Sequence, residues 1–379
     1  MRHQTLVYTD TAATTSYHKG SLTDIAQHFT KGADIVSTSA VLHEVYSYAG
    51  GYAAIDESIR GISTVLRPGG FYAYRDVYGV DNLSQHERVR HVYDRSAWVA
   101  FSQLFLEHYL DRATHPYHQY DDRIVFSQHG DAKKLDDIDR DVPLSVEAPV
   151  GVLREVQRHY VTFRDHVWRN GTLGFAPELE GELGNDWTDQ QRGHKRIHYT
   201  MHENDIALKS VSTPKGGEAY IVDSDIFDET TEALMSKLLD DIIVNRDNSQ
   251  HWSVWQEWLR REGSETYVYM PLNGLLGSVA IQSYEATNGE SVLLPVRQSD
   301  VSIVPRTYYN RYLKKKLSNP LFDGKQLVLF ESVALKDGSG IEQRKLAEEK
   351  ITGALGTLSV YCSQDTLTNI YSPLRKALR

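Results

Sequence analysis

The first eighty residues combine short apolar runs with one helical stripe. The run ADIVS at 33–37 has the apolar centre that is typical of a buried parallel strand. Residues 51–66 predict an amphipathic helix, because apolar side chains recur there at spacings of 4, 3 and 4. The breaker Arg67–Gly70 ends this helix, and FYAYR at 71–75 predicts the next strand. Strand, helix and strand joined by short connections predict a parallel α/β sheet.

The pattern changes near residue 80 and again near residue 263, which divides the chain into four parts. Residues 1–80 predict part of an α/β core. Residues 81–262 predict a mainly helical insertion that caps the carboxyl edge of the sheet. Strand-like runs return in 263–319 and rejoin the core sheet, and 320–379 are expected to form a C-terminal extension with one strand and one helix.

One helix of the insertion carries an unusual number of basic side chains. Its apolar stripe within 151–169 predicts one buried face, so the opposite face is expected to turn towards solvent or ligand. Arg154, Arg158 and His159 lie on that opposite face and form a candidate anion site for a carboxylate, a phosphate or part of an RNA. A solvated face that pairs with the chain's own carboxylates is the alternative interpretation.

Charge and cysteine content narrow the possible functions. The 379 residues include 51 Asp and Glu against 41 Lys and Arg, and the resulting net charge of −10 is unfavourable for a nucleic-acid or anionic-membrane coat. The single cysteine, Cys362, excludes an intrachain disulfide framework and any CxxC motif. There is no apolar run near the roughly 18 residues of a membrane span and no N-terminal apolar signal core, so a cytoplasmic location is expected.

Two histidine motifs suggest chemistry. His43 and Glu44 follow the first predicted strand, where either side chain could take a proton from a hydroxyl or an amine. Ser47 stands where the metal-binding motif HExxH needs its second histidine, so that motif fails. The alternative role of His43 is to cap the following helix. A row of histidines at every fourth position favours a solvated or substrate-facing face over a metal site: His194, His198 and His202.

The segment from Ala33 to Asp76 resembles the second half of a class I, Rossmann-like, S-adenosylmethionine-dependent methyltransferase domain. In that family the fourth strand is followed by a loop that borders the substrate, then by a helix and a Leu-x-Pro-Gly-Gly turn into the fifth strand. Here the loop is Thr38–Tyr48, the helix is 51–66 and the turn is Leu66–Gly70. The resemblance implies an α/β core whose ligands lie at the carboxyl ends of the strands.

The same resemblance implies a set of cofactor-binding residues. Thr5–Asp10 matches the second strand, and Asp10 stands where the family's acidic residue binds the cofactor ribose. Ser21 and Leu22 match the loop after the third strand, near the adenine, and Ser37 ends the fourth strand. No metal is implied.

The family's Gly-rich loop after the first strand is missing. Only 23 residues separate Asp10 from Asp34, which is too short for a first strand, a Gly-rich loop and the elements that follow it. The core is therefore expected to be incomplete at its N-terminus. Three interpretations stay open: a complementary chain supplies the Gly-rich half, the chain is a piece of a longer protein, or the domain no longer binds the cofactor.

The resemblance implies methyl transfer from S-adenosylmethionine to an oxygen or nitrogen atom of a small or medium-sized acceptor, within a heteromer. His43 and Glu44 are the expected catalytic residues, and the expected acceptor-binding residues are Tyr46, Arg154, Arg158 and His159. Two alternatives from other classes remain. One is a non-catalytic methyltransferase-like subunit that acts as a scaffold or regulator. The other is an RNA-modification factor that uses the arginine-bearing helix face.

Overall fold

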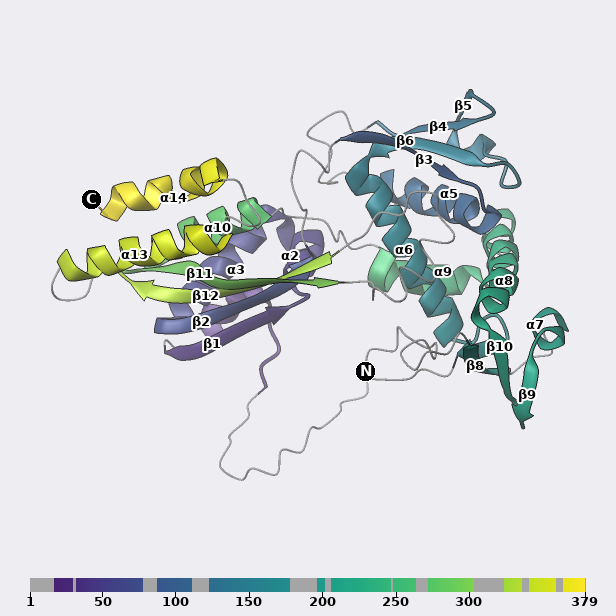
Figure 1. Cartoon of the computed structure of the whole chain (residues 1–379), viewed down its shortest axis with the longest axis horizontal. Coiled ribbons are helices and arrows are strands. Elements are labelled where there is room, and N and C mark those ends of the chain that lie inside the picture. The colour runs from purple at the N-terminus through teal and green to yellow at the C-terminus, as the bar shows by residue number, and fades with distance from the viewer. Residues whose placement is uncertain are drawn as a thin grey trace.

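The computed structural model describes most of the chain, and the structural statements that follow refer to this part. The described residues are 17–29, 32–77, 87–110, 123–177, 196–201, 206–246, 248–263, 272–302, 324–335, 341–358 and 364–378. Figure 1 shows two lobes, one built around a four-stranded sheet and one that holds most of the insertion.

The sheet of the first lobe is mixed. Its strand order is β1 (Ala33–Ser39), β2 (Leu66–Val77), β12 (Gly324–Ala334) and β11 (Ser291–Ser302). The strands β1 and β2 are parallel, as predicted, whereas β12 is antiparallel to both of its neighbours. The predicted α/β class is therefore confirmed, with a mixed sheet in place of a wholly parallel one.

The core of the first lobe lies between this sheet and the helices that pack on it. Helix α3 (Tyr52–Val65) connects β1 to β2 and packs against α10 (Leu272–Ala286). The apolar stripe predicted for this helix is buried, because it faces the sheet residues Tyr72 and Phe330, which are also fully buried. Two further helices complete the lobe. These are α13 (Ile341–Leu358), which packs on β11 and β12, and α14 (Gln364–Leu378), which packs on α10 and α13.

The segment Arg67–Gly70, which was predicted to end the helix, forms a bulge at the start of β2. Ala33 pairs with Leu66, but the next pair joins Ile35 to Phe71, so the residues between Leu66 and Phe71 loop out of the ladder. Gly69 adopts a φ of +79°, a conformation that other residues reach only with strain. The helix ends at Val65, and the chain turns directly into the strand.

The strand β12 is an interior member of the sheet. It forms a continuous antiparallel ladder with β2 on one side and with β11 on the other. Residues 320–379 are therefore not simply an extension, because their first element completes the core. The position of this strand between two strands that precede it in sequence is not encoded in any local pattern.

The second lobe contains two antiparallel sheets in addition to helices. The strand order of the first sheet is β3 (Arg88–Tyr93), β6 (Leu144–Pro149), β4 (Val125–Gln128) and β5 (Asp131–Lys133). The strand order of the second sheet is β7 (Phe175–Pro177), β8 (Arg196–Met201), β10 (Ala219–Asp223) and β9 (Thr213–Gly216). The described part of the insertion contains more helix than strand, as predicted, but it also contains these two sheets, which were not predicted because strands of three to six residues give little periodic signal.

The helices of the second lobe share an aromatic core. They are α5 (Ser96–Leu110), α6 (Val150–Arg169), α7 (Ile206–Ser210), α8 (Ser224–Val244) and α9 (Trp252–Trp258). Trp98 of α5 stacks on Tyr160 of α6 with 3.9 Å between ring centroids. Phe163 of α6 lies edge-on to both Trp255 and Trp258. No helix of the described part of the chain has the length and apolarity that crossing a membrane requires.

Candidate functional site

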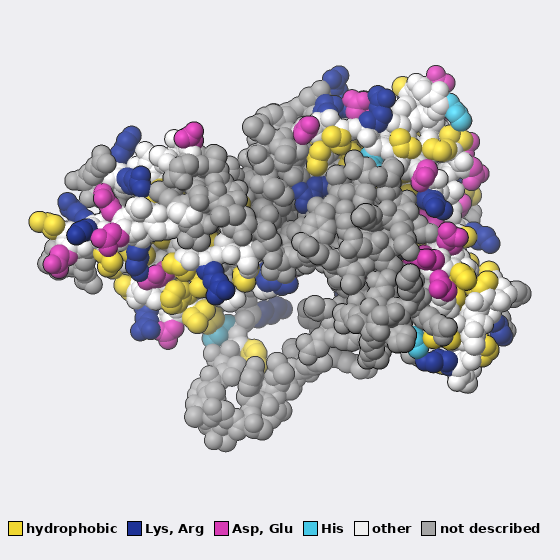
Figure 2. Space-filling view, viewed as in Figure 1, with side chains coloured by type: hydrophobic (Ala, Val, Ile, Leu, Met, Phe, Trp, Pro, Cys, Tyr) yellow, Lys and Arg dark blue, Asp and Glu magenta, His cyan; other side chains and the backbone are white. Residues whose placement is uncertain are grey.

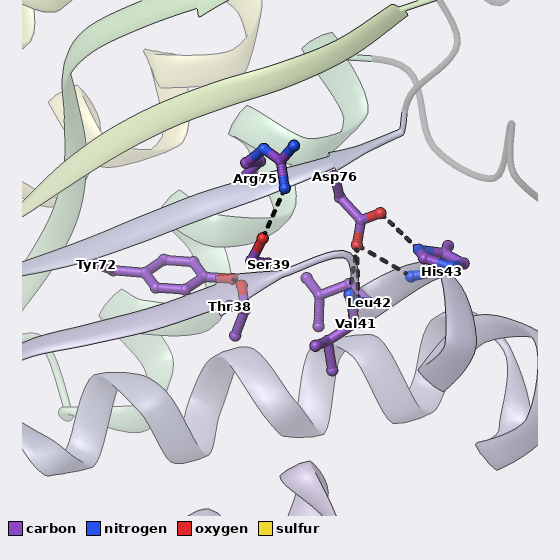
Figure 3. A network of polar contacts seen from close by, with 8 residues as sticks. All are labelled: Thr38, Ser39, Val41, Leu42, His43, Tyr72, Arg75 and Asp76. Atoms are coloured by element: carbon purple, nitrogen blue, oxygen red, sulfur yellow. Dashed lines mark hydrogen bonds and ion pairs between the residues drawn. The ribbon is translucent and has the colours of Figure 1, made fainter. Parts of the chain in front are cut away.

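Asp76 binds the loop and helix that follow β1 through both of its carboxylate oxygens (Figure 3). Its Oδ1 lies 2.6 Å from Nδ1 of His43. Its Oδ2 accepts the backbone N–H groups of Val41, Leu42 and His43 at 3.2, 2.8 and 3.2 Å. Asp76 is 1% exposed and His43 is 4% exposed, so the pair is shielded from solvent.

The parallel pairing of β1 and β2 produces this contact. Ser39 pairs with Arg75 at the carboxyl ends of the two strands, and the N–H group of Ala40 donates to the Arg75 carbonyl at 2.7 Å. Ala40 has a φ of +54°, which turns the chain sharply into helix α2 (Leu42–Val45). The first N–H groups of a helix have no partner within it, and Asp76 supplies that partner from the neighbouring strand. Left-handed backbone at a non-glycine residue is strained and is typical of functional sites.

The hydrogen bonds define the roles of the two side chains. Amide N–H groups can only donate, so Asp76 is an acceptor in every contact. A neutral imidazole carries its hydrogen on the nitrogen that faces an acceptor, which places it on Nδ1 of His43. The second nitrogen, Nε2, then has the lone pair. This is the arrangement of a general base that is oriented by a carboxylate.

The two predicted catalytic residues point in different directions. His43 is buried against Asp76, whereas Glu44 is exposed. Consecutive residues of a helix are about 100° apart around its axis, so they rarely share one site. The helix cap is provided by Asp76 and not by the side chain of His43, so the capping role considered for His43 belongs to its partner.

Tyr46 lies in a π-helical turn, Tyr46–Gly50, that continues directly from α2. It is half-buried, and its ring centroid is 4.9 Å from that of Tyr52. Burial raises the pKa of Tyr52, and the Tyr46 hydroxyl adds to the increase. Single π turns inside helical segments are frequent at functional sites.

Those predicted cofactor residues that the structure describes are not gathered in one place. Asp10 lies outside the described residues. The hydroxyl of Ser21 caps the short 3-10 helix Leu22–Asp24, accepting from the N–H of Thr23 at 3.3 Å. Ser37 is on β1 and is exposed.

The segment that begins at Ser21 packs beside the later half of α3. Gly61 of that helix faces Ile25 so closely that a Cβ atom at position 61 would lie 2.7 Å from the Ile25 side chain. Because α3 starts near the carboxyl ends of the strands and ends near their amino ends, Ser21 and Leu22 lie away from His43. The structure therefore does not bring these two residues together with the His43–Asp76 pair.

The arginine-bearing face of α6 is buried, which contradicts the expectation that it turns to solvent. The exposed fractions of Arg154, Arg158 and His159 are 5%, 3% and 0%. Helix α6 contacts α5, α9, β3 and β6, and most of its residues are buried. His159 places Nδ1 2.8 Å from the Glu155 carbonyl oxygen and stacks on Phe105. These residues belong to the second lobe, whereas His43 and Asp76 belong to the first (Figure 1).

The histidine row is only partly described. His194 and His202 lie outside the described residues. His198 is on β8, with Nδ1 2.6 Å from Nζ of Lys215. Within the described ranges there is no group of three or more His, Cys, Asp or Glu side chains that could hold a metal ion.

Asp76 is the site residue that the sequence interpretation did not include. The sequence feature that could have identified Asp76 is its position directly after the predicted strand FYAYR. That strand was expected to lie in the same parallel sheet as the strand that leads to His43. Comparison of the chain with protein-family models, curated proteins and solved structures returns no significant match. The functional interpretation therefore rests on the geometry of the site.

Proposed function

We propose that the protein takes part in methyl transfer from S-adenosylmethionine to an oxygen or nitrogen atom of a small or medium-sized acceptor. The observation that carries the proposal is the His43–Asp76 pair at the carboxyl ends of two adjacent parallel strands. Ligands of open α/β sheets bind at that edge, where loops and helix N-termini converge.

The strand arrangement supports the proposal. The strands β1 and β2 are parallel neighbours, joined through helix α3, in an open sheet. The helix α3 and the glycine-containing bulge at 66–71 occupy the places of the family's helix and Pro-Gly-Gly turn. This correspondence extends over β1, α3 and β2, the segment that carries the sequence resemblance.

The proposed chemistry assigns one role to each member of the pair. S-adenosylmethionine, when bound, supplies a methyl group on a positively charged sulfur. The acceptor atom forms a bond to the methyl carbon as the carbon–sulfur bond breaks, and the electron pair of that bond stays on sulfur. His43 Nε2 takes the proton that the acceptor loses, and Asp76 stabilises the resulting imidazolium through Nδ1. Alignment of the two reactants by the edge of the sheet supplies the remaining rate enhancement.

The described residues fit the acceptor side of such a site better than the cofactor side. Of the predicted cofactor residues within the described ranges, only Ser37 lies on β1, the strand that leads to the His43–Asp76 pair. Ser21 and Leu22 lie beside the later half of α3. The proposal therefore includes a complementary polypeptide that carries the Gly-rich half.

The strand β1 supports the presence of such a partner. Its sequence is that of a buried strand, yet it pairs only with β2 in the described part of the chain, and Ile35 is 65% exposed. Figure 2 shows apolar side chains gathered along the lower edge of the first lobe, where β1 and β2 lie in Figure 1. Edge strands usually carry charges or proline that prevent pairing, and β1 has only Asp34 near its start. Addition of a parallel strand to this edge would cover Ile35.

The burial of the arginine-bearing face bears on one of the two alternative functions and not on the other. The RNA-binding alternative loses its exposed arginine face, because Arg154 and Arg158 are buried. The scaffold alternative differs from the proposal in one measurable property, which is cofactor binding by the assembled protein.

The test is to purify the tagged chain together with its partner from its own cells and to measure S-adenosylmethionine binding by calorimetry. We expect micromolar binding by the assembly and weak or no binding by the isolated chain. Ile35→Lys should prevent assembly, whereas Val244→Lys, at a position 67% exposed on α8, should not. Micromolar binding by the isolated 379-residue chain would contradict the need for a partner, and no binding by the assembly would favour the scaffold.

A further inference from the structure

A cleft lies between helices α5 and α8 of the second lobe. Its volume is about 420 Å³, which is within the range of sites that hold small molecules. One wall is the segment that begins α5, residues 94–97. The other wall is one face of α8, whose lining residues recur at spacings of three and four: Glu229, Glu232, Ala233, Ser236 and Lys237.

The core of the lobe holds one side of the cleft in place. Glu232 is 8% exposed, and its two carboxylate oxygens accept from the Tyr160 hydroxyl at 3.2 Å each. Tyr160 is fully buried and stacks on Trp98 of α5. Because the same aromatic contact joins α5 to the helix that supports Glu232, the two walls are fixed relative to each other.

The cleft contains charges of both signs that do not pair with each other. Within the described part of the chain, the side chains of Arg95 and Lys237 form no hydrogen bond or ion pair, and neither does the carboxylate of Asp94. Figure 2 shows acidic and basic side chains interspersed along the side of the second lobe where α8 lies in Figure 1. Single unpaired charges are ordinary on an open surface, but here three of them line one cleft. Two cations and one carboxylate are therefore available to a ligand.

The start of α5 adds to the attraction for negative charge. Ser96 and Ala97 belong to the first turn of this fifteen-residue helix, and both line the cleft. The first N–H groups of a helix have no partner within it, and the helix dipole favours a carboxylate there. A ligand that complements the three unpaired side chains has two negative charges and one positive charge.

We propose that this cleft binds an acidic α-amino acid, with its two carboxylates at Arg95 and Lys237 and its ammonium group at Asp94. An arginine donates two parallel N–H groups to a carboxylate, and a lysine attracts it as a point charge. Neither His43 nor Asp76 lines the cleft, so the inference goes beyond the proposed methyl transfer and does not depend on it.

Calorimetry on the full chain tests the inference with three probes. L-glutamate has both carboxylates and the ammonium group, glutarate has the carboxylates without the ammonium group, and L-glutamine has one carboxylate fewer. We expect L-glutamate to bind at least about tenfold more tightly than either of the others, because each of them loses one contact between charged groups. No measurable binding of L-glutamate at millimolar concentration, or equal binding of glutarate or L-glutamine, would overturn the inference.

Matched variants locate the binding in the cleft. Arg95→Gln and Lys237→Gln should each weaken L-glutamate binding by about tenfold, whereas Lys345→Gln removes the same charge from an exposed position on α13 and should have no effect. Ala233→Phe alters no charge but fills part of the cleft from an exposed position, so it should also weaken binding. Thermal unfolding checks that each variant is folded. Unchanged binding in Ala233→Phe, or an equal loss in Lys345→Gln, would show that the cleft is not the binding site.

Discussion

His43 and Asp76 are 33 residues apart in the sequence, and Nδ1 of the one lies 2.6 Å from Oδ1 of the other. The same carboxylate also accepts three backbone N–H groups from the start of α2. Asp76 therefore fixes both the direction of the helix and the orientation of the imidazole. A side chain with two such functions should be sensitive to substitution in two separable ways, in stability and in turnover.

Replacement of His43 by glutamine should reduce turnover far more than stability. Loss of a general base typically lowers the rate by about 10²–10⁴-fold, and glutamine retains a polar group that can face Asp76. The measurement is methyl transfer by the assembled protein, with thermal unfolding as the stability readout. The control is Glu44→Gln, which alters an exposed neighbour and should retain turnover. Near-normal turnover in His43→Gln would remove His43 from the mechanism.

Replacement of Asp76 by asparagine should affect both properties. The amide oxygen can still accept from Val41 and Leu42, but its NH₂ group replaces an acceptor, so at least one charge-assisted hydrogen bond is lost. We expect the free energy of unfolding to fall by roughly 1–3 kcal/mol. The pH–rate profile of the variant should also shift, because the carboxylate no longer stabilises the imidazolium. An unchanged profile with reduced stability would limit Asp76 to a structural role.

Substitution of Gly70 by alanine should destabilise the first lobe. A Cβ atom there would lie 3.0 Å from the carbonyl oxygens of Ala33 and Arg67, which belong to the backbone and cannot move aside easily. We expect a loss of about 1–3 kcal/mol in chemical denaturation. The matched control is Gly353→Ala in α13, where nothing lies within 4 Å of the new Cβ atom and the gain in helix propensity is about 1 kcal/mol. Equal effects of the two substitutions would contradict the packing described for the bulge.

His91 should make the stability of the second lobe depend on pH. Burial lowers its pKa from 6.5 to about 4, although the nearby Asp94 acts in the opposite direction. Between these two values the unfolded chain binds a proton that the folded chain does not, so stability falls as the pH decreases from about 6.5 to about 4. The expected slope approaches 1.4 kcal/mol per pH unit. Urea denaturation across this range should show the slope, and His91→Leu should reduce it; an identical slope in the variant would contradict the assignment.

Elements with a local signal were predictable from the sequence. The strand β1, the helix α3 and the second half of β2 each have a characteristic apolar pattern within fewer than fifteen residues, and the structure contains all three. Helix α14 was not predicted. The position of β12 between β2 and β11 depends on its pairing with β2, in which Lys325 pairs with Val77, and no local pattern reports so distant a contact.

The site was predictable only in part for the same reason. His43 was identified because it follows a strand, but its partner Asp76 was not, because the contact depends on the pairing of β1 with β2. The arginine-bearing face of α6 was expected to be exposed, since an amphipathic pattern implies that one helix face contacts solvent. In the structure that face is covered as well, and Arg154 and Arg158 are buried.

The most direct test of the central claim is transfer of a labelled methyl group by the protein purified with its natural partner. The assembly would be incubated with methyl-tritiated S-adenosylmethionine and a small-molecule extract of the same cells, and label in the extract would be counted. We expect label transfer by the wild-type assembly and a decrease of at least about 10²-fold in His43→Gln, with cofactor affinity unchanged. Absence of transfer by an assembly that binds the cofactor, or equal transfer by His43→Gln, would contradict the assignment of the His43–Asp76 pair as the proton acceptor of a methyltransferase.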